Sequence, residues 1–157
     1  MIRAQGSIVI DRSAEEVLTY VLDLDRYRQA DAKIAKVLLD MEIGPDQLEG
    51  RQRFRGSLRG LPTPAQTQIV KLEPWRSLRI QSDPNDWTTK LATFSGGFIC
   101  EPMSTEAVEL THYEQFAFRG PLAWIMDPML RGWMQRYLIE TELPALKRLI
   151  ESTKRVL

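Results

Sequence analysis

The chain has 157 residues, a length that favours one domain able to bury its own core. Its 21 basic residues balance 21 acidic ones, which argues against a nucleic-acid binder, because such proteins usually carry a basic excess. One cysteine and one histidine cannot build a disulfide or a metal site of several thiolates and imidazoles, so we expect no metal and no cofactor. No apolar run reaches the roughly 20 residues of a membrane span, and the first residues lack a secretory signal. We therefore expect a cytoplasmic protein.

The first expected elements are a strand and two short helices. Apolar residues share one parity over residues 4–11, which is typical of a half-buried strand. Ser13 and Glu16 have the spacing of a capping box, so a helix should begin here and bury the apolar residues of 17–22. Residues 23–31 indicate a second short helix.

Six further strands are expected from period-two patterns. They cover residues 33–41, 48–60, 66–73, 77–82, 87–100 and 106–119. The segment Leu61–Pro64 predicts a break, and Gly96–Gly97 predicts either a bulge or a point at which the sheet curls. The connections are short, which predicts an antiparallel meander.

The last segment is expected to be helical. Gly120–Pro121 and Asp127–Pro128 each place a proline at a helix start, which predicts a short first turn and then one long helix over about 128–153. Pro144 should kink that helix. The predicted fold class is α+β: a curled seven-stranded antiparallel sheet that grips a long C-terminal helix, with two short helices between the first two strands. A curled sheet of this kind leaves a space between itself and the helix.

Two segments carry a resemblance to a known family. Ser13-Ala14-Glu15-Glu16-Val17 after the first strand, and Pro121–Glu151 with Leu146-Lys147-Arg148-Leu149 near its end, resemble the START-like helix-grip superfamily (SRPBCC). The similar branch is the polyketide cyclase/dehydrase type, related to the birch-pollen-allergen fold. The resemblance implies that residues 1–157 form a single START-like ligand-binding domain. It also implies an internal pocket for apolar ligands such as lipids, polyketides, hormones and quinones.

His112 is the first candidate for the site. It shares a parity with Glu114 and with mostly apolar neighbours on the last strand, so both side chains should face the cavity about 7 Å apart. A histidine with a pKa near neutral beside a carboxylate can serve as an acid/base pair. It can also bind a ligand carbonyl or hydroxyl. The third interpretation is a histidine satisfied by a neighbour, with Glu114 paired to an arginine at the rim.

Further ligand contacts are expected on the helix and on three strands. The candidates are Met126, Met129, Leu130, Trp133 and Tyr137 on the helix, and Phe54, Leu91 and Phe116 on the strands. The helix residues can equally be plain core, and Tyr137 is the best polar candidate among them because a buried hydroxyl needs a partner. Gln66 and Gln68 enter the pocket if their parity is inward, which the sequence leaves open.

A basic stripe is expected on the outer face. Arg51, Arg53, Arg55 and Arg59 alternate with apolar residues and should project into solvent. They can pair there with Asp40 and Glu42 on the preceding strand. An anionic partner surface is the alternative.

These features lead to one main functional hypothesis. The protein is expected to bind, and in some settings transport, a hydrophobic small molecule such as a lipid, polyketide or quinone in a cavity of roughly 300–1,000 Å³. One alternative is a polyketide cyclase, aromatase or dehydratase in which His112 moves the proton and Glu114 orients it. The other is a protein-interaction module that uses the arginine stripe. Whether a reaction occurs is left undecided, and a homodimer is left open.

Overall fold

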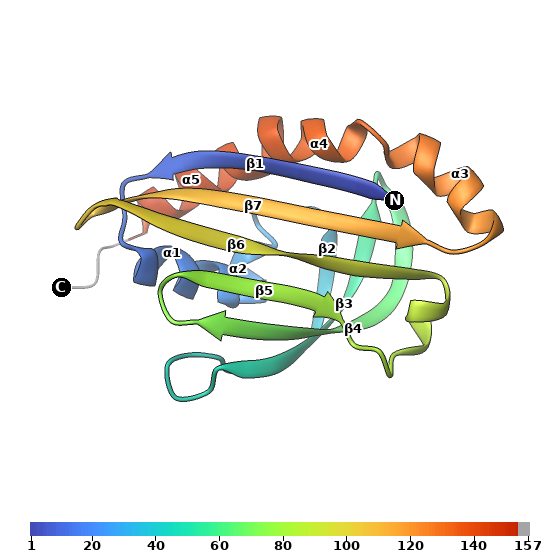
Figure 1. The fold of residues 1–157 in the computed structure, drawn as a ribbon, viewed down its shortest axis with the longest axis horizontal. Coiled ribbons are helices and arrows are strands. Elements are labelled where there is room, and N and C mark those ends of the chain that lie inside the picture. Colours follow the sequence, from blue (N-terminus) through green and yellow to red (C-terminus); the bar gives the residue numbers. More distant parts are fainter. Residues whose placement is uncertain (154–157) are drawn as a thin grey trace.

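The computed structural model describes residues 1–153, and its core is a seven-stranded antiparallel sheet that curls under the C-terminal helices (Figure 1). The strands are β1 (Ile2–Ile10), β2 (Ile34–Asp40), β3 (Glu49–Leu58), β4 (Leu61–Glu73), β5 (Ser77–Ser82), β6 (Ala92–Ser104) and β7 (Ala107–Phe118). Their order is β1-β7-β6-β5-β4-β3-β2. Each strand from β2 to β7 therefore pairs with the next one along the chain, and β1 pairs with β7. The predicted fold class is confirmed. Among the described residues, no helix is long and apolar enough to cross a membrane.

Two short helices, α1 (Ala14–Leu22) and α2 (Leu24–Tyr27), connect β1 to β2. The predicted capping box begins α1. The Ser13 hydroxyl accepts from the Glu16 amide at 3.2 Å, and the Glu16 carboxylate accepts from the Ser13 amide at 3.3 Å. This reciprocal pair satisfies two amides that the first helical turn cannot. The loop after α2 then leads to Lys33 and β2.

The C-terminal segment is a broken helix rather than one continuous rod. It comprises α3 (Pro121–Leu130), α4 (Trp133–Tyr137), the π-helical turn η2 (Leu138–Glu142) and α5 (Leu143–Ser152). The predicted start near Pro128 is wrong, because α3 begins at Pro121 and contains Pro128. The chain breaks at Gly132, whose φ of 79° is incompatible with α-helix. The π-helical turn ends at Glu142, and Pro144 lies in the first turn of α5, so the kink expected at Pro144 stays a prediction.

These irregularities align the buried side of the segment. Every fourth residue is at most 2% exposed: Leu130, Met134, Leu138, Glu142, Leu146 and Ile150. In an unbroken α-helix each step of four residues rotates a side chain by about 40°, so such a series would turn away from the sheet. The break at Gly132 and the π-helical turn interrupt that rotation and keep all six inside. Glu142 is thereby placed in the interior.

Of the two alternatives expected at Gly96–Gly97, the bulge is wrong. The ladder continues in register there, with Gly97 opposite Tyr113 on one side and Arg79 on the other. Glycine is needed because a Cβ at position 97 would lie 2.2 Å from the Leu78 carbonyl oxygen. The two glycines therefore let neighbouring strands approach closely.

Two further boundaries differ from the sequence interpretation. The segment from Leu61 to Pro64 belongs to β4, because Arg59 and Gly60 make the turn with positive φ values of 52° and 85°. The start of the strand expected over residues 87–100 forms instead the 3-10 helix η1 (Trp87–Lys90), which the Asp86 side chain caps.

Candidate functional site

A cavity lies on the concave side of the sheet, beside α1 and α2. Its volume is about 70 Å³, well below the roughly 300–1,000 Å³ of typical ligand pockets. It is lined by Val21, Leu24, Tyr27, Asp31, Lys33, Ile34, Gln52, Phe54, Gly56, Ser57, Leu58, Thr63, Gln66, Gln68, Ile80, Phe94, Phe98, His112, Glu114 and Phe116. Most of this lining is apolar, and a ligand of ordinary size requires side chains or a helix to move.

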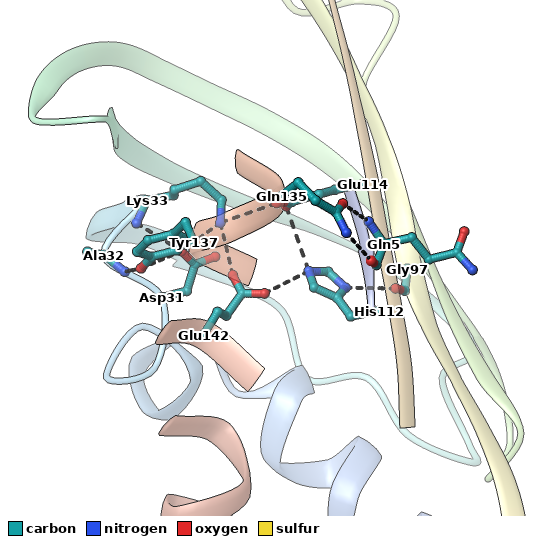
Figure 2. A network of polar contacts seen from close by, with 10 residues as sticks. All are labelled: Gln5, Asp31, Ala32, Lys33, Gly97, His112, Glu114, Gln135, Tyr137 and Glu142. Carbon is teal, nitrogen blue, oxygen red and sulfur yellow. Dashed lines mark hydrogen bonds and ion pairs between the residues drawn. The ribbon is translucent and has the colours of Figure 1, made fainter. Parts of the chain in front are cut away.

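A buried cluster of charged side chains stands beside the cavity (Figure 2). Lys33, in the loop before β2, is its centre. The ammonium nitrogen of Lys33 lies 2.9 Å from Glu142 Oε1, 3.0 Å from Asp31 Oδ1 and 3.5 Å from Glu114 Oε1. The cluster thus joins the loop after α2, β7 and the π-helical turn, which are far apart in sequence.

His112 lies on β7 next to this cluster. Its Nδ1 is 2.8 Å from the carbonyl oxygen of Gly97, which can only accept, so Nδ1 carries a proton. Its Nε2 is 3.0 Å from Glu142 Oε2 and 3.7 Å from Glu114 Oε2. The ring also stacks on Phe98 with centroids 4.1 Å apart. Both nitrogens therefore face acceptors, which favours the imidazolium.

The electrostatics lead to the same conclusion for His112. Burial alone would lower the pKa of His112, but the carboxylates of Glu142 and Glu114 outweigh burial and raise that pKa to about 10. The expectation of a pKa near neutral is therefore wrong, because the sequence pattern did not reveal the second carboxylate. The arginine partner considered for Glu114 is also wrong, since its cations are Lys33 and His112.

The three carboxylates differ from one another. Burial by itself would raise the pKa of each, but Lys33 and then His112 lower the pKa of Glu142 to about 2, and they also lower that of Glu114. Burial, and next the charge of Glu142, raise the pKa of Asp31 to about 6 despite the neighbouring Lys33. Asp31 is thus the member of the cluster that exchanges a proton closest to neutral pH.

Tyr137 connects α4 to the same loop. Its hydroxyl accepts from the Ala32 amide at 2.7 Å and lies 3.4 Å from Asp31 Oδ1, to which it donates. The Lys33 ammonium lies 4.5 Å from the centre of its ring, a cation–π contact. Burial and then Asp31 raise the pKa of Tyr137 to about 12. Its hydroxyl therefore has protein partners.

The sequence left open which face of the sheet Gln66 and Gln68 occupy. In the structure both side chains are on the inner face and line the cavity. Gln68 Nε2 donates to Gln52 Oε1 at 3.1 Å. Gln52 Nε2 in turn donates to the Leu22 carbonyl at 2.9 Å and to Asp40 Oδ1 at 2.8 Å. This chain of amides fixes the polar wall of the cavity opposite the charged cluster.

The basic stripe lies outside, as predicted. Arg51, Arg53, Arg55 and Arg59 are all exposed. Arg51 pairs with Asp83 at 3.1 Å rather than with Asp40, so that predicted pair is wrong because Asp40 faces Gln52. Arg59 donates to the Met129 carbonyl at 2.7 Å and so ties the β3–β4 turn to α3.

The structure separates the predicted ligand contacts into two groups. His112, Glu114, Phe116 and Phe54 line the cavity. The helix residues do not line it: Leu130 is fully buried, and Met126, Met129, Trp133 and Tyr137 are partly buried. Leu91 follows η1, is 39% exposed and does not line it either. Contact of this second group with a ligand stays a prediction.

Sequence reasoning missed three members of the cluster. Glu142 had a usable signal, because it is the one charged residue in an otherwise apolar series at every fourth position. Asp31 and Lys33 had none, since a short loop of charged residues is ordinarily a solvated surface. Only the tertiary fold brings them against Glu142.

The cluster also contains three residues of types that ligate metal ions. One ligand atom each from His112, Glu114 and Glu142 lie within 4.8 Å of one another, a set able to hold an ion. The Lys33 ammonium already lies against both carboxylates. A metal ion would have to displace that cation, so the residues present fit an ammonium better than a metal.

The curled sheet that grips the C-terminal helices defines a helix-grip fold. The family profile described as "Polyketide cyclase / dehydrase and lipid transport" matches residues 1–151, and the chain belongs to this family. No curated protein matches the sequence significantly.

Solved structures agree on the fold. The Zhui aromatase/cyclase from Streptomyces sp. R1128 superposes with a TM-score of 0.71 at 15% identity, covering 95% of this chain and 93% of the other. A START superfamily protein from Mycobacterium smegmatis superposes with a TM-score of 0.70 at 15% identity, covering 95% of this chain and 97% of the other. The protein TTHA0849 from Thermus thermophilus superposes with a TM-score of 0.72 at 14% identity, covering 94% of this chain and 96% of the other. At these identities the likeness concerns the fold alone.

Proposed function

We propose that this protein binds a small, largely apolar molecule in the cavity between the curled sheet and the helices. One observation carries the proposal: a hollow enclosed mainly by apolar side chains, four of them phenylalanines, lies next to a buried cluster of charged groups. Such a combination of an apolar lining with a few polar groups is typical of small-molecule sites.

The apolar lining supplies most of the affinity in this proposal. Phe54, Phe94, Phe98 and Phe116 contribute aromatic surface, and buried apolar area stabilises a complex by about 25 cal/mol per Å². Because the hollow measures about 70 Å³, entry of a ligand requires the walls to separate. The break at Gly132 lets α3 move relative to α4, although no residue of either helix lines the cavity itself.

The relatives support a ligand-binding role in general terms. The family description includes polyketide cyclases, dehydrases and lipid transport, and one structural neighbour is an aromatase/cyclase. A polyketide-like or lipid-like ligand is consistent with an apolar lining interrupted by a few polar groups.

A fluorescence titration with N-phenyl-1-naphthylamine tests the proposal. We expect saturable enhancement with the unmodified protein. Ile80→Trp, which places a large ring in the cavity wall, should weaken binding at least tenfold, about 1.4 kcal/mol. The matched control is Ile99→Trp, because Ile99 is 40% exposed and does not line the cavity. Thermal unfolding of each variant checks that it folds. Equal binding by Ile80→Trp, or no binding by the unmodified protein, contradicts the proposal.

A second candidate function is acid–base catalysis on the bound molecule, as in a cyclase or dehydratase. It is favoured by the Asp31 carboxyl, which lines the cavity and whose pKa, raised by burial and by Glu142 to about 6, is close enough to neutral pH for the group to take up and release a proton. In such a reaction His112 would act only through its positive charge, because both of its nitrogens already face protein acceptors, Gly97 and Glu142.

Mass spectrometry of products from poly-β-ketone thioester analogues tests this second candidate. Asp31→Asn should abolish product formation and keep probe binding, whereas the exposed control Asp25→Asn should change neither. Unchanged product formation by Asp31→Asn would exclude Asp31 as the acid.

A further inference from the structure

The outer side of α3 departs from the usual pattern of a surface helix. Its exposed residues have the spacing that places side chains on one face of a helix. They are Pro121, Trp124, Ile125 and Pro128, and we call them the α3 face. Trp124 is 86% exposed and Ile125 is 66% exposed. The exposed face of a surface helix is ordinarily polar, so an apolar one indicates a surface that another body covers.

Positive charge borders the α3 face. Arg119 precedes α3 and Arg131 follows it, and both are exposed. Arg59, in the β3–β4 turn, donates to an α3 carbonyl at 2.7 Å and so lies beside the helix. The sequence between residues 115 and 137 has one acidic residue, Asp127, which lies 3.5 Å from the N-terminal amino group and 3.9 Å from Arg131. One carboxylate therefore faces three arginines and an amino group.

The charges of the molecule are divided between the two ends of the sheet. Figure 1 shows α3 beside the end of β7, at one end of the sheet. Of the charged residues described in the three strand connections at this end, those that are exposed are Arg59, Lys90 and Arg119. The three hairpin connections at the other end expose Glu42, Asp46, Arg76 and Glu106. The formal net charge of zero therefore conceals a basic end and a mainly acidic end, and an anionic surface would attract the α3 end.

The mouth of the cavity lies at the same end. The lining residues that are partly exposed, and so mark the mouth, are Ser57, Thr63, Gln66, Ile80 and Phe94. Ser57 and Thr63 flank the β3–β4 turn, which Arg59 ties to α3. A body that covers the α3 face therefore also lies next to the mouth.

A second copy of this chain fits the α3 face poorly. A helix of ten residues is about 15 Å long and about 10 Å wide, so its face covers about 150 Å², far below the roughly 800 Å² that each partner of a stable complex buries. A two-fold dimer through this face would also bring the two arginine borders together.

A bilayer that contains anionic lipids fits the same face. Insertion into the headgroup region needs only a few apolar side chains, and tryptophan is enriched at that level. Lipid phosphates also supply the negative charge that the arginine border lacks.

We propose that the α3 face docks this protein on the surface of a bilayer containing anionic lipids. Trp124 and Ile125 enter the headgroup region, and Arg59, Arg119 and Arg131 contact lipid phosphates. The mouth of the cavity then lies beside the membrane. This goes beyond the proposed function, because docking requires no ligand in the cavity.

Co-sedimentation with lipid vesicles tests the docking. We expect the protein to bind vesicles of phosphatidylcholine with about 30% phosphatidylglycerol at least tenfold more tightly than vesicles of phosphatidylcholine alone. Raising the salt to about 0.5 M should weaken binding to the anionic vesicles, because salt screens the arginines.

Two pairs of variants assign the surface. Replacing both Trp124→Ser and Ile125→Asn should weaken binding to the anionic vesicles at least tenfold. The matched control combines Met103→Ser with Ile139→Asn, which removes two exposed apolar side chains outside the α3 face and should change nothing.

The second pair tests the border. Arg131→Gln should weaken binding to the anionic vesicles about fivefold, whereas Arg76→Gln, exposed at the opposite end, should not. Thermal unfolding checks that every variant folds.

The outcomes separate docking from the proposed function. Failure to bind anionic vesicles, equal binding to both kinds of vesicle, or unchanged binding by the Trp124 and Ile125 variant overturns the proposal. A dimer in light scattering that this variant dissociates also overturns it, because a second copy then covers the α3 face. Titration with N-phenyl-1-naphthylamine contains no lipid, so its result decides the proposed function independently of docking.

Discussion

At the scale of single residues, the cluster around His112 and Lys33 holds two cations against three carboxylates, all buried. Isolated charges in such a place would be prohibitively costly, and pairing is what makes them tolerable. Each group is therefore dependent on the others. Replacement of one member leaves its partners buried and uncompensated.

The cluster makes stability dependent on pH in a specific direction. The pKa of His112 is about 10 in the folded protein, whereas an unperturbed histidine has a pKa of 6.5. His112 therefore contributes its stability fully below pH 6.5 and loses that contribution as the pH rises to about 10. We expect the unmodified protein to lose up to about 1.4 kcal/mol per pH unit relative to His112→Gln across that window. Urea unfolding of both proteins at a series of pH values measures this. A difference that stays constant from pH 6.5 to 10 would refute it.

Glu142 should be the most sensitive carboxylate. It is fully buried and contacts both cations, so Glu142→Gln should lower the free energy of unfolding by about 3–5 kcal/mol. Glu140 is an exposed glutamate in the same π-helical turn, and Glu140→Gln should stay within about 0.5 kcal/mol. Chemical denaturation distinguishes the two. Equal effects of the two substitutions would mean that the buried charge is not structural.

At the scale of elements, Gly96 and Gly97 link sheet packing to the site. They allow β5, β6 and β7 to approach closely, and the Gly97 carbonyl fixes the protonated Nδ1 of His112. The backbone of one strand therefore sets the orientation of a side chain on the next.

Gly97→Ala should destabilise the protein by about 1–3 kcal/mol, because its Cβ would lie 2.2 Å from the Leu78 carbonyl oxygen. Gly44→Ala is the matched control, since nothing lies within 4 Å of a Cβ there. Differential scanning calorimetry measures both. Equal melting temperatures for the two variants would show that strand spacing tolerates the methyl group.

Elements whose signals are local were predicted well. The capping box at Ser13 and Glu16 and the period-two strands depend on neighbours within a few residues, and both are present. The break at Gly132 and the π-helical turn were not predicted, because they depend on how the segment follows the curvature of the sheet. The bulge expected at the glycines of β6 was wrong for a related reason. The sequence shows only that two residues lack side chains, whereas the need for glycine arises from the neighbouring strand, which lies too close for a Cβ atom.

The site was predicted in part on the same physical grounds. Strand parity placed His112 and Glu114 inside, because alternation along one strand is a local property. Their partner Lys33 comes from a loop, and Glu142 comes from a helix, so no spacing in the sequence relates them. The pKa of His112 could not be inferred without those partners.

At the scale of the whole molecule, the small cavity implies that the protein opens to admit a ligand. Figure 1 shows α3 at the end of the C-terminal segment beyond the break, away from α5. Within α3 only Leu130 is buried, whereas α5 buries Leu143, Leu146 and Ile150. The α3 segment is therefore the part of the helix that moves at least cost.

Hydrogen exchange should reveal that difference. We expect amides of α3 to exchange faster than those of α5, and to slow when N-phenyl-1-naphthylamine is bound. Exchange followed by mass spectrometry, with and without the probe, measures both effects. Equal protection of α3 and α5 in the free protein would argue against opening at Gly132.

Native mass spectrometry of the protein isolated from its own host tests the central claim most directly. The claim predicts a small-molecule mass on the unmodified protein and on Ile99→Trp, and a bare protein mass for Ile80→Trp. A bare mass for all three proteins, or the same bound mass on all three, would contradict a ligand held inside the sheet.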